Sequence, residues 1–432
     1  MKLLSICIIL TSLVMTASCK KYFDGKNTDP DNPLEVSPNI MLPGIQGTLC
    51  FSMGGDASRY SSIYTQHMTG VSRQWAVLQN YKFIGEDVNT LFEDNLYANV
   101  LVEINRMKVI STKKGYHYYN GIGKAMEAYT LLFITDSWNA APYSEAFQGL
   151  DQLQPKYDSQ AELYATIFSL LTEAKADFNQ PDGGGLIPGS DDLIYGGDIP
   201  SWQGFVSFIE ARAYLHLAKN DPSKYADALN ALNGGGLIAD AAYKFGPDHR
   251  NPMFQFNQER GDCSVGDYLS NLVTSLNDPR AALYNQPFDE DNTFITDSRS
   301  VFLATLTEQH FILAECNFQV SGAAAAHPHF LDGINSSLDG YGLTSSAAAY
   351  LGQATVDPGA GSLTLDFIMT QKYIALFMDP ELFNDWRRTG IPALTPNAGS
   401  TIPRRYPYPQ QELNLNQNTP QTTIYSSVDW DI

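Results

Sequence analysis

The helical architecture is indicated first by residues 213–232, which read AYLHLAKNDPSKYADALNAL. Two segments rich in Ala and Leu flank the dipeptide Asp221-Pro222, and the second segment carries Tyr225. Small residues let two helices cross closely, and a proline that follows a polar residue favours a turn between them. The stretch therefore predicts two helices packed side by side and joined by a short turn.

This helix pair resembles a tetratricopeptide unit, a repeat in which successive helix pairs stack on one another. Weaker echoes of the pattern occur elsewhere in the chain. The helix that ends near Phe133 is expected to pair with residues 161–178, and residues 308–318 with residues 330–338. Residues 365–378 are expected to open a last unit. Because strand-like alternation is scarce by comparison, the patterns predict an all-α chain.

The first residues have the pattern of an export signal. Lys2 precedes an apolar run over residues 3–14, which is shorter than the roughly 20 residues that a helix needs to cross a bilayer. The sequence Thr16-Ala17-Ser18-Cys19 resembles the lipobox of bacterial lipoproteins, although a threonine replaces the usual aliphatic residue. In such proteins the chain is cut before the cysteine, which is acylated. We therefore expect a signal peptide over residues 1–18 and a lipid anchor at Cys19.

The segment that follows, residues 19–47, is rich in Asp, Asn and Pro, as in Asp29-Pro30-Asp31-Asn32-Pro33 and Leu42-Pro43-Gly44. Proline disfavours helical conformation in the residue before it, so the segment predicts an extended, lipidated tether. Residues 48–432 are then expected to form a single body. No later segment of the sequence is apolar for long enough to span a membrane.

Composition limits the function of this body. The chain has 432 residues with 44% hydrophobic content, enough for a large core. Its formal net charge of −20 argues against a nucleic-acid partner, because such binding depends on Lys and Arg at the phosphates. Cys50, Cys263 and Cys316 are widely spaced, and they show neither a disulfide framework nor a zinc motif. Buried thiols are expected.

Seven further motifs, taken in chain order, carry a family resemblance. They are Thr135-Asp136-Ser137-Trp138; Pro142-Tyr143-Ser144-Glu145-Ala146-Phe147; Asp192-Leu193-Ile194-Tyr195-Gly196-Gly197-Asp198 with Trp202 and Arg212; Leu276-Asn277-Asp278-Pro279-Arg280; Gln371-Lys372-Tyr373-Ile374-Ala375-Leu376-Phe377; Asn384-Asp385-Trp386-Arg387-Arg388-Thr389-Gly390; and Arg404-Arg405-Tyr406-Pro407-Tyr408-Pro409. With the lipoprotein start, this set resembles the SusD/RagB-like nutrient-binding lipoproteins over nearly the whole chain.

The resemblance implies a fold and a role. It implies an all-helical body of four tetratricopeptide-like pairs forming a scaffold, with an irregular loop-rich half that carries the ligand. It also implies a partner, a TonB-dependent outer-membrane porin of the SusC type, over which the lipoprotein sits as a lid. The protein would be lipid-anchored in the outer membrane and would face the cell exterior. No cofactor is implied.

Two of the motifs are better explained by structure than by ligand binding. Asp198 is placed to cap a helix, with Trp202 filling the groove behind it. The run Asn384-Asp385-Trp386-Arg387-Arg388 could expose an arginine that grips a ligand carboxylate, but internal stacking or ion pairing is the favoured interpretation. The motifs therefore identify the family without locating its binding site.

A catalytic interpretation finds little support in the sequence. The acidic pairs Glu86-Asp87 and Glu93-Asp94 could supply the two carboxylates of a glycosidase, but adjacent acids on a helix point apart and these lie in a polar stretch. The sequence contains no Gly-x-Ser-x-Gly elbow, no His-Glu-x-x-His helix and no phosphate-binding loop. We expect a binding protein and no enzyme.

A zinc site is not predicted, while calcium binding stays open. His327-Pro328-His329 offers two imidazoles without a third ligand nearby in sequence, and it is interpreted as a polar loop before the helix that starts at Phe330. Four acids could offer oxygen ligands to calcium, but their spacing is not that of an EF-hand loop. They are Asp182, Asp191, Asp192 and Asp198.

The predicted ligand-binding region is the segment after the first helix, residues 66–83. It contains Arg73, Trp75, Asn80 and Tyr81. The ring of Trp75 lies among polar neighbours, as an exposed stacking platform would, while a position in the core is the alternative. This assignment follows the region that carries the ligand in better-known members of the family, and no motif matches it residue by residue.

A second candidate is the aromatic and polar loop around Tyr284 and Phe288. Two ligand classes stay open. Exposed aromatic faces would favour an oligosaccharide, whose C–H surfaces stack on rings, whereas an apolar or charged groove would favour a peptide, as for a RagB-like protein. An aromatic content of 12% favours the sugar.

Overall fold

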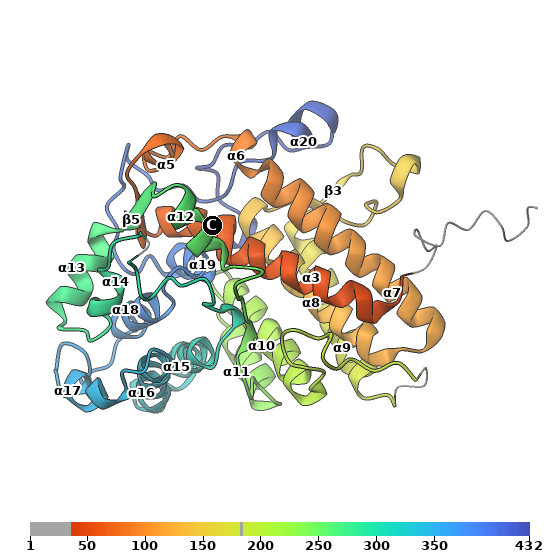
Figure 1. Ribbon diagram of the computed structural model, residues 1–432. Coiled ribbons are helices and arrows are strands. Elements are labelled where there is room, and N and C mark those ends of the chain that lie inside the picture. Colours follow the sequence, from red (N-terminus) through yellow and green to blue (C-terminus); the bar gives the residue numbers. More distant parts are fainter. Residues whose placement is uncertain (1–35, 182–184, 290) are drawn as a thin grey trace, which may run out of the picture.

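A computed structural model of the chain describes residues 36–181, 185–289 and 291–432 (Figure 1). The predicted signal peptide, the lipidation site at Cys19 and most of the tether lie outside these residues, as does Asp182. Three thiols in the described part, Cys50, Cys263 and Cys316, are free and buried, as expected.

The described chain is mostly helical, which confirms the predicted fold class. The α-helices are α3 (Pro38–Ser52), α4 (Ser58–Tyr64), α5 (Arg73–Leu78), α6 (Gly85–Asn89), α7 (Val102–Lys114), α8 (His117–Trp138), α9 (Gln160–Phe178), α10 (Ile199–Leu217), α11 (Lys224–Asn233), α12 (Pro252–Glu259), α13 (Asp267–Ser275), α14 (Ala281–Tyr284), α15 (Leu306–Ser321), α16 (Ala323–Gly340), α17 (Ala347–Leu351), α18 (Leu365–Ala375), α19 (Glu381–Thr389) and α20 (Gln410–Leu415). Two π-helical segments, η1 (Met53–Ala57) and η2 (Thr90–Leu101), and three 3₁₀ turns, η3 (Gly149–Asp151), η4 (Thr344–Ser346) and η5 (Asp429–Asp431), complete the helical elements.

Six short strands form three two-stranded antiparallel sheets. The strands are β1 (Met68–Gly70), β2 (Ala141–Pro142), β3 (Tyr157–Asp158), β4 (Ala241–Tyr243), β5 (Cys263–Val265) and β6 (Val301–Ala304). They pair as β1–β5, β2–β3 and β4–β6. Two of these sheets join loops that are far apart in sequence, with Thr69 opposite Ser264 and Tyr243 opposite Val301.

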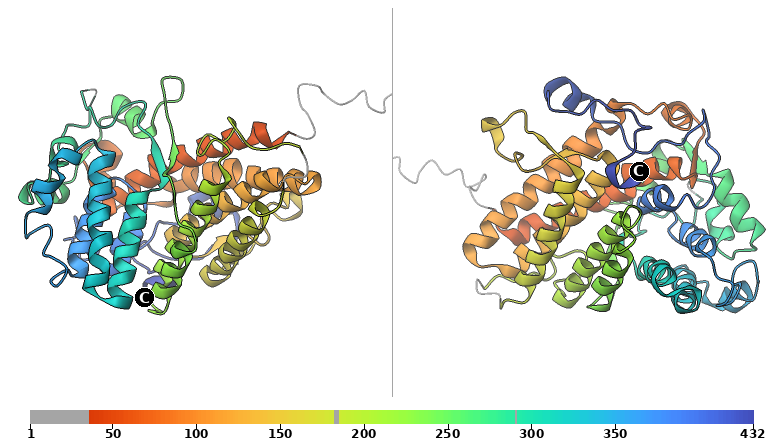
Figure 2. Two further views of the ribbon diagram at one scale, coloured as in Figure 1. Left: turned by 90° about the horizontal axis from the view of Figure 1, so that it is seen from below. Right: turned by 180° about the vertical axis from the view of Figure 1, so that it is seen from behind.

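Three helix pairs form the scaffold: α8 with α9, α10 with α11, and α15 with α16 (Figures 1 and 2). All three were predicted, and the second is the pair read from residues 213–232. The expected last unit is represented by α18, which packs against α15 and α16. The irregular half includes the short helices and loops between α11 and α15.

Side-chain caps explain where several of these helices begin. The hydroxyl of Ser159 accepts from the backbone of Glu162 at the start of α9, and the Glu162 carboxylate accepts in return from Ser159. The carboxylate of Asp198 accepts from the backbone of Ser201 at the start of α10, as predicted, and Trp202 is fully buried behind it. Such caps satisfy backbone N–H groups that have no partner inside the helix.

Part of the tether prediction is wrong. Residues 38–47 are helical and form most of α3. One face of this helix is buried and includes the side chains of Met41, Leu42 and Ile45. Pro38 stands at the first helical position, where its missing N–H costs nothing, so this proline starts the helix. The stabilisation from burying apolar side chains outweighs the unfavourable effect of Pro43 on helix formation.

The loop predicted at His327-Pro328-His329 is also helical. These residues lie inside α16, which begins at Ala323. The four alanines at residues 323–326 have the highest helix propensity and extend the helix ahead of Pro328, which lies in its second turn. The polar face of α16 was therefore mistaken for a loop.

Family motifs converge on buried ion pairs, one within the scaffold and one between the scaffold and α19. Arg212 of α10 contacts Glu308 of α15 through its Nε at 2.9 Å. Arg388 of α19 contacts Glu315 of α15, with Nη2 to Oε2 at 2.7 Å, and Asp385 of its own helix at 2.8 Å. Because buried charges need partners, these pairs fix α10, α15 and α19 relative to one another. The predicted internal role of this arginine-rich run is confirmed.

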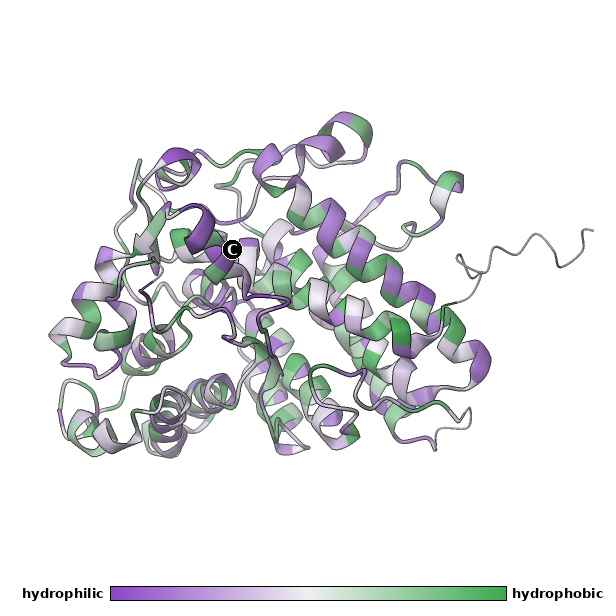
Figure 3. Cartoon of the chain, in the orientation of Figure 1, coloured by the Kyte–Doolittle hydropathy of each residue, from purple (hydrophilic) through white to green (hydrophobic). Residues whose placement is uncertain are grey.

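Polar and apolar residues alternate along the outer helices such as α7 (Figure 3). Within the described residues, no helix combines the length and apolar character that crossing a bilayer requires.

Candidate functional site

The segment expected to bind the ligand folds around a buried tryptophan. Trp75 lies in α5 and its side chain is only 4% exposed, so the expectation of an exposed ring is wrong. Its ring stacks on Tyr60 at 5.7 Å between centroids and meets the edge of Phe256 at 5.1 Å. The guanidinium of Arg59 lies 5.6 Å from its centroid. The polar neighbours of Trp75 in sequence misled the prediction, because Arg73 and Gln74 are exposed while the indole is buried in the core.

The other residues of this segment divide between surface and core. Arg73 is exposed, with its Nε donating to the buried carboxylate of Asp262 at 2.6 Å. Asn80 is exposed and donates to the carbonyl oxygen of Ala76 within its own turn. Tyr81 is buried, and its hydroxyl accepts from the backbone of Asn397. Of the four predicted residues, two therefore offer polar groups at the surface and none offers an exposed aromatic face.

Both residues of the second predicted loop are buried. Tyr284 is fully enclosed, with its hydroxyl donating to the carbonyl oxygen of Ile374 at 3.0 Å. Phe288 is 6% exposed and belongs to the main core. The structure keeps these two residues apart from Arg73, which contacts Asp262, and from Trp75, which contacts Phe256 of α12.

Tyr284 nevertheless lies directly behind a cleft. Its ring stacks on Phe377 at 4.2 Å and meets Tyr341 edge-on at 5.8 Å, and both of those residues line the cleft. We call this feature the Arg299 cleft. It has a volume of about 340 Å³ and is lined by Asp240, Arg299, Ser300, Phe302, Thr305, Leu306, Thr307, Ser336, Ser337, Asp339, Gly340, Tyr341, Ala375, Leu376, Phe377 and Asp379.

The β4–β6 sheet assembles one wall of the Arg299 cleft. Asp240 immediately precedes β4 and Arg299 comes two residues before β6, so the pairing of these strands brings both side chains to the same opening. The facing wall comes from the end of α16 and the residues after it, including Tyr341. No spacing in the sequence connects these segments, which is why sequence reasoning missed the cleft.

The backbone of Arg299 is fixed by a hydrogen bond, and its side chain is available to bind a ligand. The amide of Asn251 donates to the Arg299 carbonyl oxygen at 2.9 Å. The guanidinium carbon lies 3.7 Å from the centroid of Phe294 and 6.0 Å from that of Tyr341. Among the described residues no carboxylate pairs with this guanidinium, in contrast to Arg212 and Arg388. An arginine oriented by an aromatic ring, with free N–H groups, can donate several hydrogen bonds to a bound molecule.

Carboxylates complete the polar lining. Asp240 accepts from the backbone of Leu306 at 2.7 Å, and burial raises its pKa. Burial raises the pKa of Asp379 to about 7, and the nearby Glu308 carboxylate adds to this increase. Near neutral pH the Asp379 carboxyl can therefore donate as well as accept. Asp339 is exposed and accepts from the hydroxyl of Thr344.

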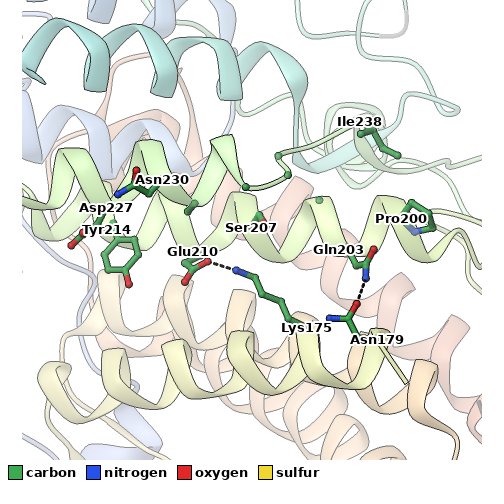
Figure 4. A pocket seen from close by; sticks show the side chains of 15 residues that line it. Lys175, Asn179, Pro200, Gln203, Ser207, Glu210, Tyr214, Asp227, Asn230 and Ile238 are labelled. Carbon is green, nitrogen blue, oxygen red and sulfur yellow. Dashed lines mark hydrogen bonds and ion pairs between the residues drawn. The ribbon is translucent and has the colours of Figure 1, made fainter. Parts of the chain in front are cut away.

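A larger cavity of about 610 Å³ lies on the scaffold, between α9, α10 and α11 (Figure 4). Four of its polar side chains already interact in pairs. Lys175 pairs with Glu210, and Gln203 donates to Asn179 at 3.2 Å. Few groups in this cavity are left to recognise a ligand, so the Arg299 cleft is the stronger candidate despite its smaller volume.

The acids considered for calcium have structural partners where they are described. Asp192 accepts from the indole of Trp202 at 2.7 Å and from the side chain of Gln46 at 2.7 Å, while Asp198 caps α10. Asp191 accepts from the hydroxyl of Tyr119. In the described part of the chain these carboxylates do not gather around one point that an ion could occupy.

Comparison with known proteins places the chain in a family. The model of a SusD-like family, described as starch-binding and associating with the outer membrane, matches residues 30–298 and 289–409. The chain belongs to this SusD-like family. The resemblance read from the sequence motifs is thereby confirmed, and with it the association of the family with the outer membrane and with nutrient binding.

Solved structures agree in fold. A SusD/RagB family protein from Bacteroides thetaiotaomicron is similar over 89% of this chain and 95% of its own, with 22% identity and a TM-score of 0.73. A chitin-binding SusD homolog from Flavobacterium johnsoniae is similar over 91% of this chain and 97% of its own, with 21% identity and a TM-score of 0.74. A chitin-binding protein reaches a TM-score of 0.75 at 19% identity, with coverage of 92% and 100%. No curated protein sequence matches the chain.

Proposed function

We propose that this chain is a cell-surface lipoprotein that binds a nutrient glycan and presents it to a TonB-dependent outer-membrane porin of the SusC type, without catalysing a reaction. The observation that carries the proposal is the guanidinium of Arg299, which no carboxylate of the described chain pairs with, in a cleft lined by hydroxyls, carboxylates and rings. The proposed function needs no cofactor.

The lining of the cleft suits a sugar. The hydroxyls of a glycan can accept hydrogen bonds from Arg299 and donate them to Asp240 and Asp339. The partly exposed rings of Phe302 and Tyr341 offer apolar surface to the C–H face of a pyranose. A volume of about 340 Å³ falls within the range of roughly 300–1,000 Å³ typical of small-molecule sites.

Two relatives described as chitin-binding support a glycan over a peptide, whereas the SusD/RagB likeness keeps a peptide as the alternative ligand. The two are distinguished by screening the purified protein against glycan and peptide arrays. We expect saturable signals on glycans. Binding confined to peptides would replace the glycan proposal with the RagB-like one.

The acidic pairs weighed for glycosidase chemistry support binding without catalysis. Glu86 and Asp94 are exposed, and the Asp87 carboxylate accepts from the backbone of Ile84 at 3.0 Å to close the start of α6. Glu93 is partly buried. Burial, and to a smaller extent the negative charge of Glu412, raises the pKa of Glu93 to about 7. None of these acids lines the Arg299 cleft. The purified protein is expected to bind oligosaccharides and leave them uncleaved.

Transport requires a partner, because the described helices cannot themselves cross a membrane. A SusC-type porin would receive the ligand from the lipoprotein above it. Gentle detergent extraction of native membranes, followed by purification of this protein, should recover a large β-barrel protein in comparable amounts. Recovery of this protein alone, under conditions that preserve other outer-membrane complexes, would contradict the lid model.

Anchoring depends on Cys19, which the lipobox-like sequence places at the mature N-terminus. Each acyl chain contributes about 0.8 kcal/mol per buried CH₂ group, so two or more chains hold a protein firmly at a membrane. The Cys19→Ala variant should fold normally and move from the membrane fraction to the soluble fraction. Fractionation and mass spectrometry of the natural protein test this. A variant that stays in the membrane, together with a natural protein free of acyl groups, would show that the anchor lies elsewhere.

A further inference from the structure

Two histidines and an aspartate come together on the outer side of the α15–α16 pair. His310 lies on α15, while His329 and Asp332 lie three residues apart on α16. Residues at this spacing are neighbours on one face of a helix. The two helices run side by side (Figure 2), and they approach closely because Gly333 leaves space for the ring of Phe311.

The three side chains point their ligand atoms at a common space. One imidazole nitrogen from each histidine and one carboxylate oxygen of Asp332 all lie within 4.8 Å of one another. Around a tetrahedral zinc ion with bonds of about 2.0–2.2 Å, ligand atoms stand roughly 3.3 Å apart. Small side-chain rotations that move the ligand atoms by on the order of 1 Å would therefore bring them into position around an ion.

A second observation points to a ligand for these residues. The Nδ1 atom of His310 is buried and has no hydrogen-bond partner among the described residues. A buried polar atom without a partner is costly, and coordination of an ion through this nitrogen would satisfy it.

The neighbouring histidine on α16 behaves differently. The Nε2 atom of His327 contacts the carboxylate of Asp357 at 2.7 Å, so this imidazole already has a partner. His329 and Asp332 have no such contact within the described chain. Of the two histidines in His327-Pro328-His329, His327 is therefore already paired with Asp357. His329 instead lies close to His310 of α15 and Asp332 of its own helix.

We propose that His310, His329 and Asp332 form a binding site for a divalent transition-metal ion, with zinc as its representative. Two imidazoles and one carboxylate are the donors such ions prefer, whereas calcium and magnesium prefer all-oxygen sites. Asp332 is exposed, so solvent or another donor completes the coordination. None of these three residues lines the Arg299 cleft, so the proposal does not rest on glycan binding there.

Metal binding at this place has a structural consequence. The ligands come from both helices of the pair, so an ion would crosslink α15 and α16. Asp339, which lines the Arg299 cleft, lies about 10 Å beyond Asp332 along α16 at a rise of 1.5 Å per residue. A ligand that binds only the folded chain also stabilises it against unfolding. Zinc should therefore raise the melting temperature through these three residues.

The test is a calorimetric titration of zinc chloride into the full-length protein, purified in detergent without a polyhistidine tag and freed of metal with a chelator. We expect one equivalent of zinc to bind. The His329→Ala and His310→Ala variants should each weaken binding at least tenfold and abolish the zinc-dependent rise in melting temperature. Asp332→Asn, at an exposed position, should weaken binding in a chain whose folding is undisturbed.

The matched control is His327→Ala on the same helix, which should bind zinc like the natural protein. Calcium chloride should give no binding that depends on His329. Circular dichroism confirms that each variant is folded. Absence of zinc binding by the natural protein, or equal binding by folded His329→Ala and Asp332→Asn variants, would overturn the proposal.

Discussion

Replacing Trp75 by alanine is expected to lower the free energy of unfolding by about 3–5 kcal/mol. The indole is enclosed by Tyr60, Phe256 and Arg59, and its removal would leave a cavity that α5 and α12 can only partly close. Chemical unfolding of natural protein and variant measures the difference. The affinity of the folded fraction for its ligand should be unchanged, because the ring does not reach the surface.

The control for this prediction lies on the same helix. Val77 is 46% exposed, so Val77→Ala removes apolar atoms from α5 without opening a cavity and should change stability by less than about 0.5 kcal/mol. Trp75→Phe should fall between the two variants. If Trp75→Ala unfolded at the same denaturant concentration as the natural protein but bound its ligand more weakly, the ring would belong to a binding surface after all.

Periodic and local features of the fold were predictable from the sequence. The α10–α11 pair follows from apolar spacing around Asp221-Pro222, and Asp198 was recognised as a cap because such caps act within one turn. The start of α3 was missed because local rules for proline compete with burial. Pro43 disfavours a helix in isolation, whereas the packing of Leu42 and Ile45 against the body stabilises the helical conformation.

The site was less predictable, because its residues meet only through tertiary contacts. Trp75 was judged from its sequence neighbours, which are exposed while its own ring is buried. Arg299 reaches Tyr341 only because β6 pairs with β4 and the end of α16 lies opposite. His310 meets His329 in the same way, across a helix pair. The region around Tyr284 was a useful guide, since this buried ring supports the wall of the cleft.

The central claim is that Arg299 binds the glycan, and replacing it tests this most severely. Hydrogen bonds from a charged group are worth about 1.5–3 kcal/mol each, so Arg299→Ala should weaken binding by roughly 10- to 100-fold. The side chain carries no ion pair within the described chain, so its loss should leave the melting temperature nearly unchanged. Arg106→Ala, which removes an exposed arginine of α7 paired only with Glu103, controls for the change in net charge.

The decisive measurement is calorimetric titration of a glycan selected on the array into four proteins: the natural chain and its Arg299→Ala, Arg73→Ala and Arg106→Ala variants. Arg73 represents the segment first predicted to bind. We predict a loss of affinity in Arg299→Ala alone, with the other two variants binding like the natural protein. Full affinity in a folded Arg299→Ala variant, with a loss in Arg73→Ala, would contradict the account and move the binding site to residues 66–83.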